Sequence, residues 1–299
     1  MNLPLISILV LAGAPRAPET PIVCDNCAAW NRPREPFKVV GNTYYVGVEG
    51  LSAVVIDTGK GLILLDGALP QSALLIEANL KTLGFRIRDV RLIVNSHAHD
   101  DHAGGIALLQ RDSGAEVAAS PSGAEALRLG CPTADDPQVG DCNKIGYGAV
   151  AKVKVVKDGE AVMVGDFGIT PHFTPGHTPG STTWTWKSCE GSTCYDVVYA
   201  DSLNATSNEG FRFSGDATHP DISKSFAQSI DKVASLPCDV LLSVHPELSG
   251  TFGKQAKART GQKGPFVESG ACRIYAESAR KRLQDRLEKE KSADLDHHR

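Results

Sequence analysis

Three histidines and two aspartates crowd into the segment His97-Ala98-His99-Asp100-Asp101-His102. The segment follows the apolar run Leu92-Ile93-Val94, which predicts a buried strand, and precedes a helical pattern that opens at Gly104-Gly105. Imidazole nitrogens and carboxylate oxygens are the donors that zinc and neighbouring transition metals take, and the end of a rigid strand fixes where they point. The segment therefore predicts a metal site.

The spacing within the segment divides the donors between two ions. His97 and His99, two positions apart in an extended loop, can approach one ion from the same side, whereas Asp101 and His102 project differently and can serve a second. The alternative is a set of exposed loop histidines without a ligand role. The concentration of three of the nine histidines of the chain in this segment argues against that alternative.

A site for two ions needs about six protein donors, so further ligands must come from elsewhere. His177 lies between two Pro-Gly turns, in Thr174-Pro175-Gly176-His177-Thr178-Pro179-Gly180, which fix its conformation. His245 follows the apolar run 240–244 and so lies at the end of a predicted buried strand. His219, in a polar loop, and His172, inside a strand, compete with His245, and we expect His245 to be the ligand.

The elements around these residues alternate in a characteristic order. A meander of short antiparallel strands is expected first, then alternating helices and strands, then a second run of strands and two helices. The expected strands are 38–40, 43–48, 53–56, 62–65, 92–94, 116–119, 151–156, 161–164, 169–173, 182–186, 197–200 and 240–244, and the expected helices are 71–83, 105–111, 122–129, 222–236 and 272–291. This order predicts an α+β fold, a four-layer αββα sandwich of two mixed β-sheets with helices outside. No linker separates two domains, so residues 18–295 are expected to form one domain.

Asp66 ends the apolar run 62–65 and has two possible roles. It could orient a metal ligand through a hydrogen bond, or it could simply form the turn that leaves the strand.

The N-terminus and the cysteines both bear on location. The apolar stretch 3–14 is too short to span a bilayer and predicts a signal peptide over residues 1–17; the alternative is a buried N-terminal strand or tail.

The eight cysteines include three close pairs, Cys24 with Cys27, Cys131 with Cys142 and Cys189 with Cys194, and leave Cys238 and Cys272. Close pairs indicate disulfides and an oxidising compartment. Structural zinc at Cys24 and Cys27 would need a second Cys-x-x-Cys, which the chain lacks. We therefore expect a periplasmic or secreted protein.

Composition argues against nucleic acid as a partner. The chain has a net charge of −4 and no basic run interleaved with aromatic residues. It therefore lacks the positive charge by which proteins bind nucleic acid. The expected partner is a small-molecule substrate. The protein is expected to be a monomer without a membrane span.

Together these motifs resemble the metallo-β-lactamase superfamily, and within it the third subclass of class B β-lactamases. The residues that carry the resemblance are His97-x-His99-x-Asp101-His102, Gly176-His177-Thr178, Ala200-Asp201-Ser202-Leu203 and His245. The resemblance implies that one zinc ion is held by His97, His99 and His177 and a second by Asp101, His102 and His245. Other subclasses typically have a Cys near Ser202. The pairs Cys189/Cys194 and Cys238/Cys272 are also similar to those of the third subclass.

The function that the resemblance implies is a zinc-dependent hydrolase of the antibiotic-resistance type, which opens the amide bond of β-lactam antibiotics with a metal-bridging hydroxide. Asp101 would orient that hydroxide and act as the catalytic residue. Ser202 and Asn204 would bind the carboxylate of the substrate, although a loop serine and asparagine are also ordinary turn formers.

Two other functions stay open. A glyoxalase-type thioesterase or a lactonase on the same fold would use Asp201 as a carboxylate bridging both metals, but disulfides and export argue against cytosolic thioester substrates. A zinc-dependent structural or sensory module without turnover is disfavoured by the mixed His/Asp donor set, because structural zinc usually sits in closed, Cys-rich tetrahedra.

Overall fold

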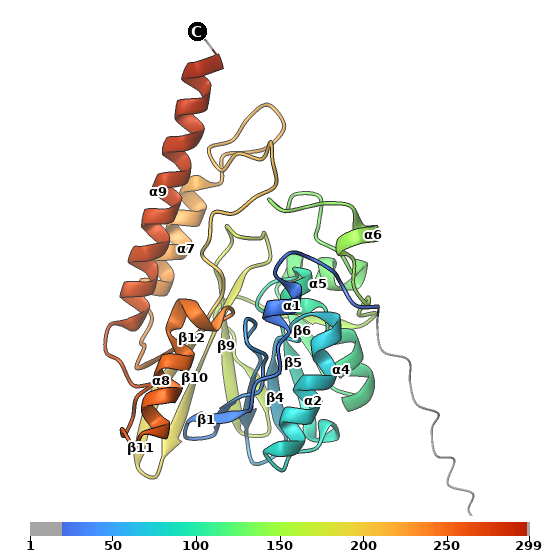
Figure 1. The fold of residues 1–299 in the computed structure, drawn as a ribbon, viewed down its shortest axis with the longest axis vertical. Helices are drawn as coiled ribbons and strands as arrows, with labels where there is room; N and C mark the ends of the chain where they lie inside the picture. Colours follow the sequence, from blue (N-terminus) through green and yellow to red (C-terminus); the bar gives the residue numbers. More distant parts are fainter. Residues whose placement is uncertain (1–19, 298–299) are drawn as a thin grey trace, which may run out of the picture.

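The computed structural model describes residues 20–297, and in it two β-sheets lie face to face (Figure 1). The expected signal peptide at residues 1–17 lies outside the described residues. The first sheet has the order β1-β2-β3-β4-β5-β6-β7. Its strands are Phe37–Val40, Thr43–Tyr45, Val54–Asp57, Leu62–Leu65, Val90–Val94, Glu116–Ala119 and Val153–Val155. The strands β1 to β4 are antiparallel, as the expected meander requires, and β4 to β7 are parallel.

The second sheet has the order β12-β11-β10-β9-β8. Its strands, in chain order from β8, are Val162–Val164, Phe167–Phe173, Thr182–Glu190, Thr193–Ala200 and Val240–Ser243. Only β11 and β12 pair in parallel, so both sheets are mixed.

Helices cover the outer face of each sheet. The helices are α1 to α9, at Cys27–Trp30, Ala73–Thr82, Asp100–Ala103, Ile106–Ser113, Pro121–Leu129, Cys142–Ile145, Ser223–Ser235, Thr251–Arg259 and Ala271–His297, with 3-10 turns at Pro70–Ser72, Ile87–Asp89 and Pro246–Ser249. The first apolar cluster lies between the first sheet and α2, α4 and α5, the second lies between the two sheets, and the third lies between the second sheet and α7 and α9. These layers confirm the predicted αββα sandwich.

The alternation of side chains along β3 shows how the sequence produces these layers. Val55 packs into the cluster beneath the helices, whereas Val54 and Ile56 point into the cluster between the sheets. Successive side chains of a strand point to opposite faces, and a strand buried on both faces is apolar throughout. The run Leu62–Leu65 is fully buried for the same reason.

Several elements differ from the sequence expectation. The strands β10 and β11 extend beyond 182–186 and 197–200, because their outer halves are polar and exposed and carry no apolar signal. Helix α8 was not expected, since it is polar over most of its surface. Asp101 and His102 were expected in a loop, but they lie in the short helix α3.

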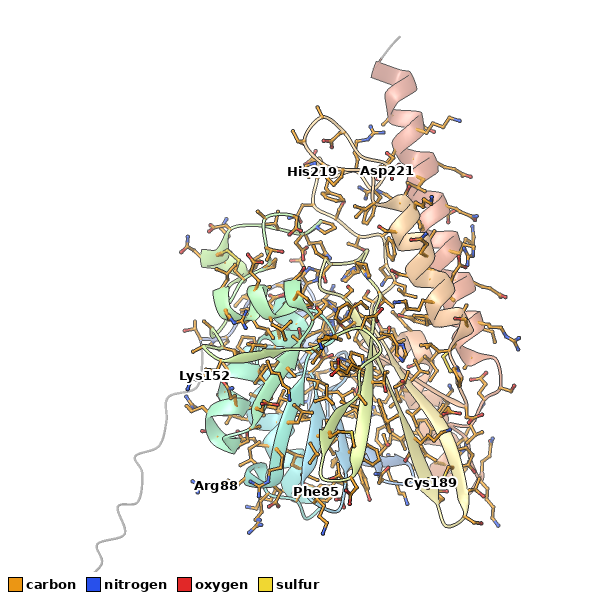
Figure 2. The ribbon with its side chains drawn as sticks, turned by 180° about the vertical axis from the view of Figure 1, so that it is seen from behind. Phe85, Arg88, Lys152, Cys189, His219 and Asp221 are labelled. Atoms are coloured by element: carbon orange, nitrogen blue, oxygen red, sulfur yellow. A yellow bond between two sulfur atoms is a disulfide. The ribbon has the colours of Figure 1, made fainter. Side chains whose placement is uncertain are left out.

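Four disulfides join the cysteines in the expected close pairs and join Cys238 to Cys272. Figure 2 shows Cys189 at the turn of the β10–β11 hairpin, at the end of the molecule opposite His219. Over the part of the chain that the structure describes, no helix is both long and apolar enough to cross a membrane.

Candidate metal centre

The loop after β5 is held by a buried carboxylate beneath it. The backbone N–H and the hydroxyl of Ser96 and the amide of Asn95 donate hydrogen bonds to Asp66 at 2.7, 2.7 and 3.1 Å. The hydroxyl of Tyr199 donates a further bond of 2.9 Å from the second sheet. Asp66 also has a φ of 63°, so it makes the left-handed turn after β4 as well. It fixes the residues that precede His97 rather than a histidine itself.

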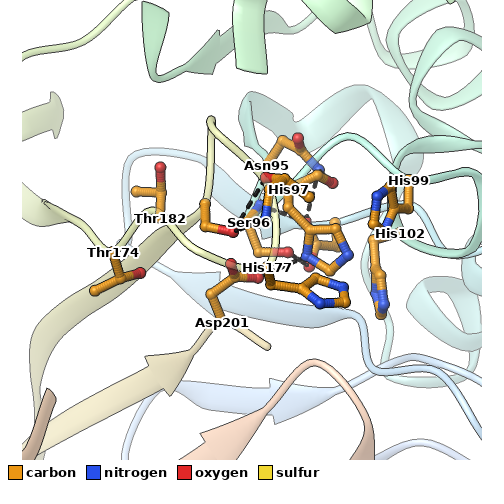
Figure 3. Close-up of polar contacts among 12 residues, drawn as sticks. Asn95, Ser96, His97, His99, His102, Thr174, His177, Thr182 and Asp201 are labelled. Atoms are coloured by element: carbon orange, nitrogen blue, oxygen red, sulfur yellow. Dashed lines mark hydrogen bonds and ion pairs between the residues drawn. The ribbon is translucent and has the colours of Figure 1, made fainter. Parts of the chain in front are cut away.

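Three buried histidines, His97, His99 and His177, converge just beyond this loop (Figure 3). One ring nitrogen from each lies within 4.8 Å of the others. His177 follows β9 of the second sheet, whereas His97 and His99 follow β5 of the first. The packing of the two sheets therefore brings the three rings together. This group matches the expected ligands of a first ion in position.

Each of the three histidines is oriented through its other nitrogen. Nδ1 of His97 lies 2.6 Å from Oδ1 of Asp201, and Nδ1 of His177 lies 2.9 Å from the carbonyl oxygen of Asn204. Nε2 of His99 lies 3.0 Å from Oδ1 of Asp136. Bonds of this kind fix the tautomer and the plane of a ring, and leave the second nitrogen for a metal.

A second group of donors adjoins the first. Oδ2 of Asp101 lies 3.3 Å from Nε2 of His102 and 3.5 Å from Nε2 of His245, and the two histidine nitrogens are 3.3 Å apart. Nδ1 of His245 is held by the carbonyl oxygen of Gly50 at 3.2 Å. The rings of His97 and His102 are 4.4 Å apart between centroids, so the groups share a border.

Burial and the attraction between neighbouring groups together set the charges in the centre. Burial lowers the pKa of His97 well below its ordinary value and that of His177 to about 4, so both rings are neutral at pH 7 and can bind a metal. Burial also favours neutral forms at His102 and Asp101, but their mutual attraction outweighs it. The Asp101 charge raises the pKa of His102 to about 9, and His102 holds the pKa of Asp101 well below its usual range.

The two competing histidines lie elsewhere. His219 lies in the 204–222 segment, where its ring bonds Asp216, and His172 bonds the hydroxyl of Thr185 across β9 and β10. Of the three candidates, only His245 joins the donors.

The two donor groups open into a cleft of about 660 Å³, whose lining includes His99, Asp101, His177, His245, Ser202, Asn204, Gln138 and Trp30. The expected substrate-binding residues, Ser202 and Asn204, thus border the donors. Sequence reasoning missed Asp136 and Gln138, which come from the polar segment 130–148, and Trp30, whose ring lies 5.4 Å from that of His245. The only signal for the first two was the close pair Cys131 and Cys142 that ties their loop.

The donor chemistry fits transition metals. Nε2 of His97 and Nδ1 of His102 are buried and have no hydrogen-bond partner among the described residues. A buried imidazole nitrogen without a partner carries a desolvation cost that a bound metal would offset at His97, where the nitrogen faces the other donors. A mixed His/Asp set open to a cleft is typical of catalytic sites rather than structural zinc sites.

Asp201 lies behind the donors rather than among them. It is fully buried, and its bond to Nδ1 of His97 places it on the side of that ring away from Nε2 (Figure 3). Oδ1 of Asp201 is therefore placed to orient the ring of His97.

Comparison with known proteins agrees with this geometry. Residues 46–245 match the family model of the Metallo-beta-lactamase superfamily. The Rm3 metallo-beta-lactamase superposes with a TM-score of 0.87 at 48% identity over 90% of this chain and 99% of that one. MEM-A1, a subclass B3 metallo-beta-lactamase isolated from a soil metagenome library, superposes with a TM-score of 0.85 at 46% identity over 88% of this chain and 99% of that one.

A curated relative is more distant. The acyl-coenzyme A thioesterase MBLAC2 of Homo sapiens is 33% identical over 162 residues, which are 50% of this chain and 56% of that protein. The chain therefore spans little more than half the length of this relative.

Proposed function

Because the chain belongs to the metallo-beta-lactamase superfamily, and its fold is that of subclass B3 enzymes, we propose that it is a zinc-dependent β-lactamase that hydrolyses the amide bond of β-lactam antibiotics. The observation that carries the proposal is the pair of adjoining donor groups at the floor of one cleft. His97, His99 and His177 would hold one zinc ion, and Asp101, His102 and His245 would hold the second. Zinc bound there would lower the pKa of water and polarise the lactam carbonyl.

The residues of the chain then have separate roles. Asp101, which borders the cleft and stays ionised, would orient the attacking water and accept its proton. Asp201 and Asp136 hold the rings of His97 and His99 in the tautomer that leaves the inner nitrogen free. No serine nucleophile is needed.

Substrate binding is assigned to the edge of the cleft. Ser202 and Asn204 would bind the carboxylate that β-lactams carry beside the ring. Ser202 directly follows Asp201, and its side chain is buried. The backbone carbonyl oxygen of Asn204 is bonded to Nδ1 of His177. Both residues therefore have a fixed position relative to the donors.

The proposal includes location and organisation. Four disulfides support folding in an oxidising compartment, and hence a periplasmic or secreted enzyme with a signal peptide at residues 1–17. Residues 18–295 would act as one monomeric catalytic domain.

The test combines activity with metal content. Hydrolysis of the chromogenic cephalosporin nitrocefin should cease after exhaustive EDTA treatment and return when zinc is added. Zinc measured by mass spectrometry should be two ions per chain in the wild type and fewer in His177→Ala. Activity that survives chelation would exclude the metal mechanism, and full zinc content in His177→Ala would remove that residue from the ligand set.

The thioesterase relative supports a second candidate, hydrolysis of an acyl-coenzyme A thioester. The bond between Oδ1 of Asp201 and Nδ1 of His97 favours the β-lactamase, because it engages this carboxylate in orienting a histidine ring. Parallel assays with nitrocefin and an acyl-coenzyme A decide between them. Turnover of the thioester alone would overturn the β-lactamase proposal.

A further inference from the structure

Two loops contribute to the walls of the cleft, and neither has regular secondary structure over most of its length. The first, here the Cys131–Cys142 loop, spans residues 131–142 and carries Gln138 and Asp136. The second, here the 204–214 loop, begins at Asn204 and contributes Thr206 and Asn208 to the cleft lining. The shape of the cleft therefore depends on what holds these loops.

The 204–214 loop is held from outside the cleft by α9. The carboxylate of Glu290, only 6% exposed, accepts hydrogen bonds from the backbone N–H groups of Phe213 and Ser214 at 3.0 and 2.9 Å and from the Ser214 hydroxyl at 2.7 Å. Figure 1 shows α9 rising beside the segment that contains this loop. A carboxylate that accepts backbone N–H groups makes charge-assisted bonds, which are stronger than neutral ones.

Arg286, one helical turn before Glu290, completes the anchor. Its Nε donates to Glu290 at 2.7 Å, and its Nη2 donates to the hydroxyl of Ser207 and the carbonyl oxygen of Phe211 at 2.8 and 2.7 Å. Arg286 and Glu290 of α9 thus bond the loop at five of its residues, which are Ser207, Phe211, Arg212, Phe213 and Ser214.

Asn208 carries this anchor across to the other loop. Its backbone N–H donates to the carbonyl oxygen of Pro137 at 2.9 Å, and its side-chain amide donates to that of Val139 at 2.6 Å. These two carbonyls flank Gln138, whose side-chain nitrogen lies 3.5 Å from Nε2 of His177.

The Cys131–Cys142 loop in turn reaches the metal centre. Oδ1 of Asp136 accepts the backbone N–H of Gln138 at 2.8 Å and also lies against His99. Hydrogen bonds, joined by short stretches of backbone, therefore link α9 through both loops to the histidines.

We propose that Glu290 and Asn208 are positioning residues for the cleft: Glu290 fixes the 204–214 loop to α9, and Asn208 transmits that restraint to the Cys131–Cys142 loop, so that Gln138 and Asp136 face the donors. The kinetic part of this inference rests on the proposed β-lactamase function; the structural part does not. Neither residue is assigned a contact with reacting atoms.

The experiment compares Glu290→Gln and Asn208→Ala with Glu288→Gln, which changes an exposed glutamate on the same helix. Glutamine keeps the shape of Glu290 but replaces one acceptor oxygen with a donor, so the N–H groups of Phe213 and Ser214 cannot both be satisfied. Amide hydrogen exchange should accelerate about tenfold in Glu290→Gln, both at Phe213 and Ser214 and at Gln138 and Val139. In Asn208→Ala it should accelerate only in the Cys131–Cys142 loop.

Kinetics provide the second readout. We expect KM for nitrocefin to rise about fivefold in Glu290→Gln while kcat changes less than about twofold, and Glu288→Gln to match the wild type. Faster exchange confined to Phe213 and Ser214 would overturn the transmission through Asn208, and an unchanged KM despite faster exchange in both loops would overturn the positioning role. Absence of β-lactamase activity in the wild type would refute the proposed function instead, and exchange would still test the restraint.

Discussion

At the scale of single residues, the centre depends on carboxylates that never enter the cleft. Asp66 holds the loop that leads to His97, Asp201 holds the ring of His97 and Asp136 holds the ring of His99. Imidazole rings turn freely about two side-chain bonds, so donors alone do not make a preorganised site. The buried carboxylates supply the orientation, and their bonds define which nitrogen faces the metal.

Asp201→Ala should weaken zinc binding by about 10- to 100-fold, because the ring of His97 loses the partner of its Nδ1. Competition with a fluorescent chelator measures the affinity. Asp201→Asn is the matched control, since its amide oxygen can still accept the Nδ1–H, and its affinity should lie between those of the wild type and the alanine variant. Zinc binding by Asp201→Ala with the affinity of the wild type would contradict the orienting role.

Residue types and spacing were enough to predict which histidines and aspartates gather in the centre, but not which residues orient them. The cluster at 97–102 and the turn around His177 carry strong local signals, because imidazoles are rare and the flanking strand and Pro-Gly turns fix them. Asp136 and Gln138 lie in a polar loop where nothing distinguishes them from solvated side chains. Their positions depend on contacts with residues more than thirty positions away, such as His177, and no local pattern encodes those contacts.

At the scale of elements, the turn of His177 is positioned by its close packing against α7. Gly176 has a φ of 151°, and a Cβ at that position would lie 2.2 Å from the ring of Phe226, which is fully buried. The turn can approach the helix only because residue 176 has no side chain. The hydroxyl of Ser229, on the same helix, also donates to the carbonyl oxygen of Pro175.

Gly176→Ala should therefore destabilise the protein by about 2–4 kcal/mol and displace His177, with loss of zinc affinity. Urea denaturation and chelator competition measure the two effects. Gly253→Ala is the control, because Gly253 lies inside α8 with nothing within 4 Å of its Cβ position, and alanine there should stabilise by about 0.5–1 kcal/mol. A Gly176→Ala protein as stable as the wild type would show that the turn can move without cost.

Glu77, on α2, makes stability depend on pH. Burial, and then the nearby Asp112, raise its pKa from 4.5 to about 7. The folded state therefore keeps a proton that the unfolded chain releases, and stability is lost as pH rises from about 4.5 to about 7. Because Glu77 is only half-buried, solvent screening leaves roughly 1 kcal/mol of this effect.

Glu77→Gln removes that titration, so it should stabilise the protein by roughly 1 kcal/mol at pH 8 and by less at pH 5. Urea denaturation at the two pH values measures the difference. Glu125→Gln, on the exposed face of α5, is the matched control for the change of a glutamate to glutamine. An equal effect of Glu77→Gln at both values would mean that its pKa is not raised by folding.

Apolar strands and amphipathic helices were predictable, because the spacing of their apolar residues along the sequence follows which side chains are buried. The run Leu62–Leu65 is apolar throughout since it is buried on both faces. The polar helix α8 and the outer halves of β10 and β11 were missed for the converse reason: they are held by main-chain pairing and by their neighbours, and their side chains face solvent.

At the scale of the whole molecule, the sandwich brings together segments that are far apart in the chain. His97 comes from the first sheet and His177 from the second, and α9, near the end of the sequence, holds the 204–214 loop through Glu290. The layer order was predictable from the order of elements. The course of the loops over the cleft was not, because it depends on contacts such as that of Asn208 with Val139.

The disulfide between Cys238 and Cys272 ties α9 to the segment that enters β12, and it closes a span of 34 residues, whereas Cys189 and Cys194 close a span of 5. If the cross-links act by restricting the unfolded chain, removal of the larger ring in Cys238→Ser/Cys272→Ser should cost about 4 kcal/mol, and removal of the smaller ring in Cys189→Ser/Cys194→Ser about 2 kcal/mol. Urea denaturation of the two double variants measures both.

The two variants should also differ in their effect on the cleft. Cys272 lies in the first turn of α9, so its loss loosens the helix that carries Glu290, whereas the β10–β11 turn lies at the end of the molecule opposite His219 (Figure 2). Faster amide exchange at Phe213 and Ser214 is therefore expected only in Cys238→Ser/Cys272→Ser. Equal exchange in both variants would mean that apolar packing against α7 and the second sheet holds α9 in place. The disulfide would then contribute to stability without contributing to the geometry of the cleft.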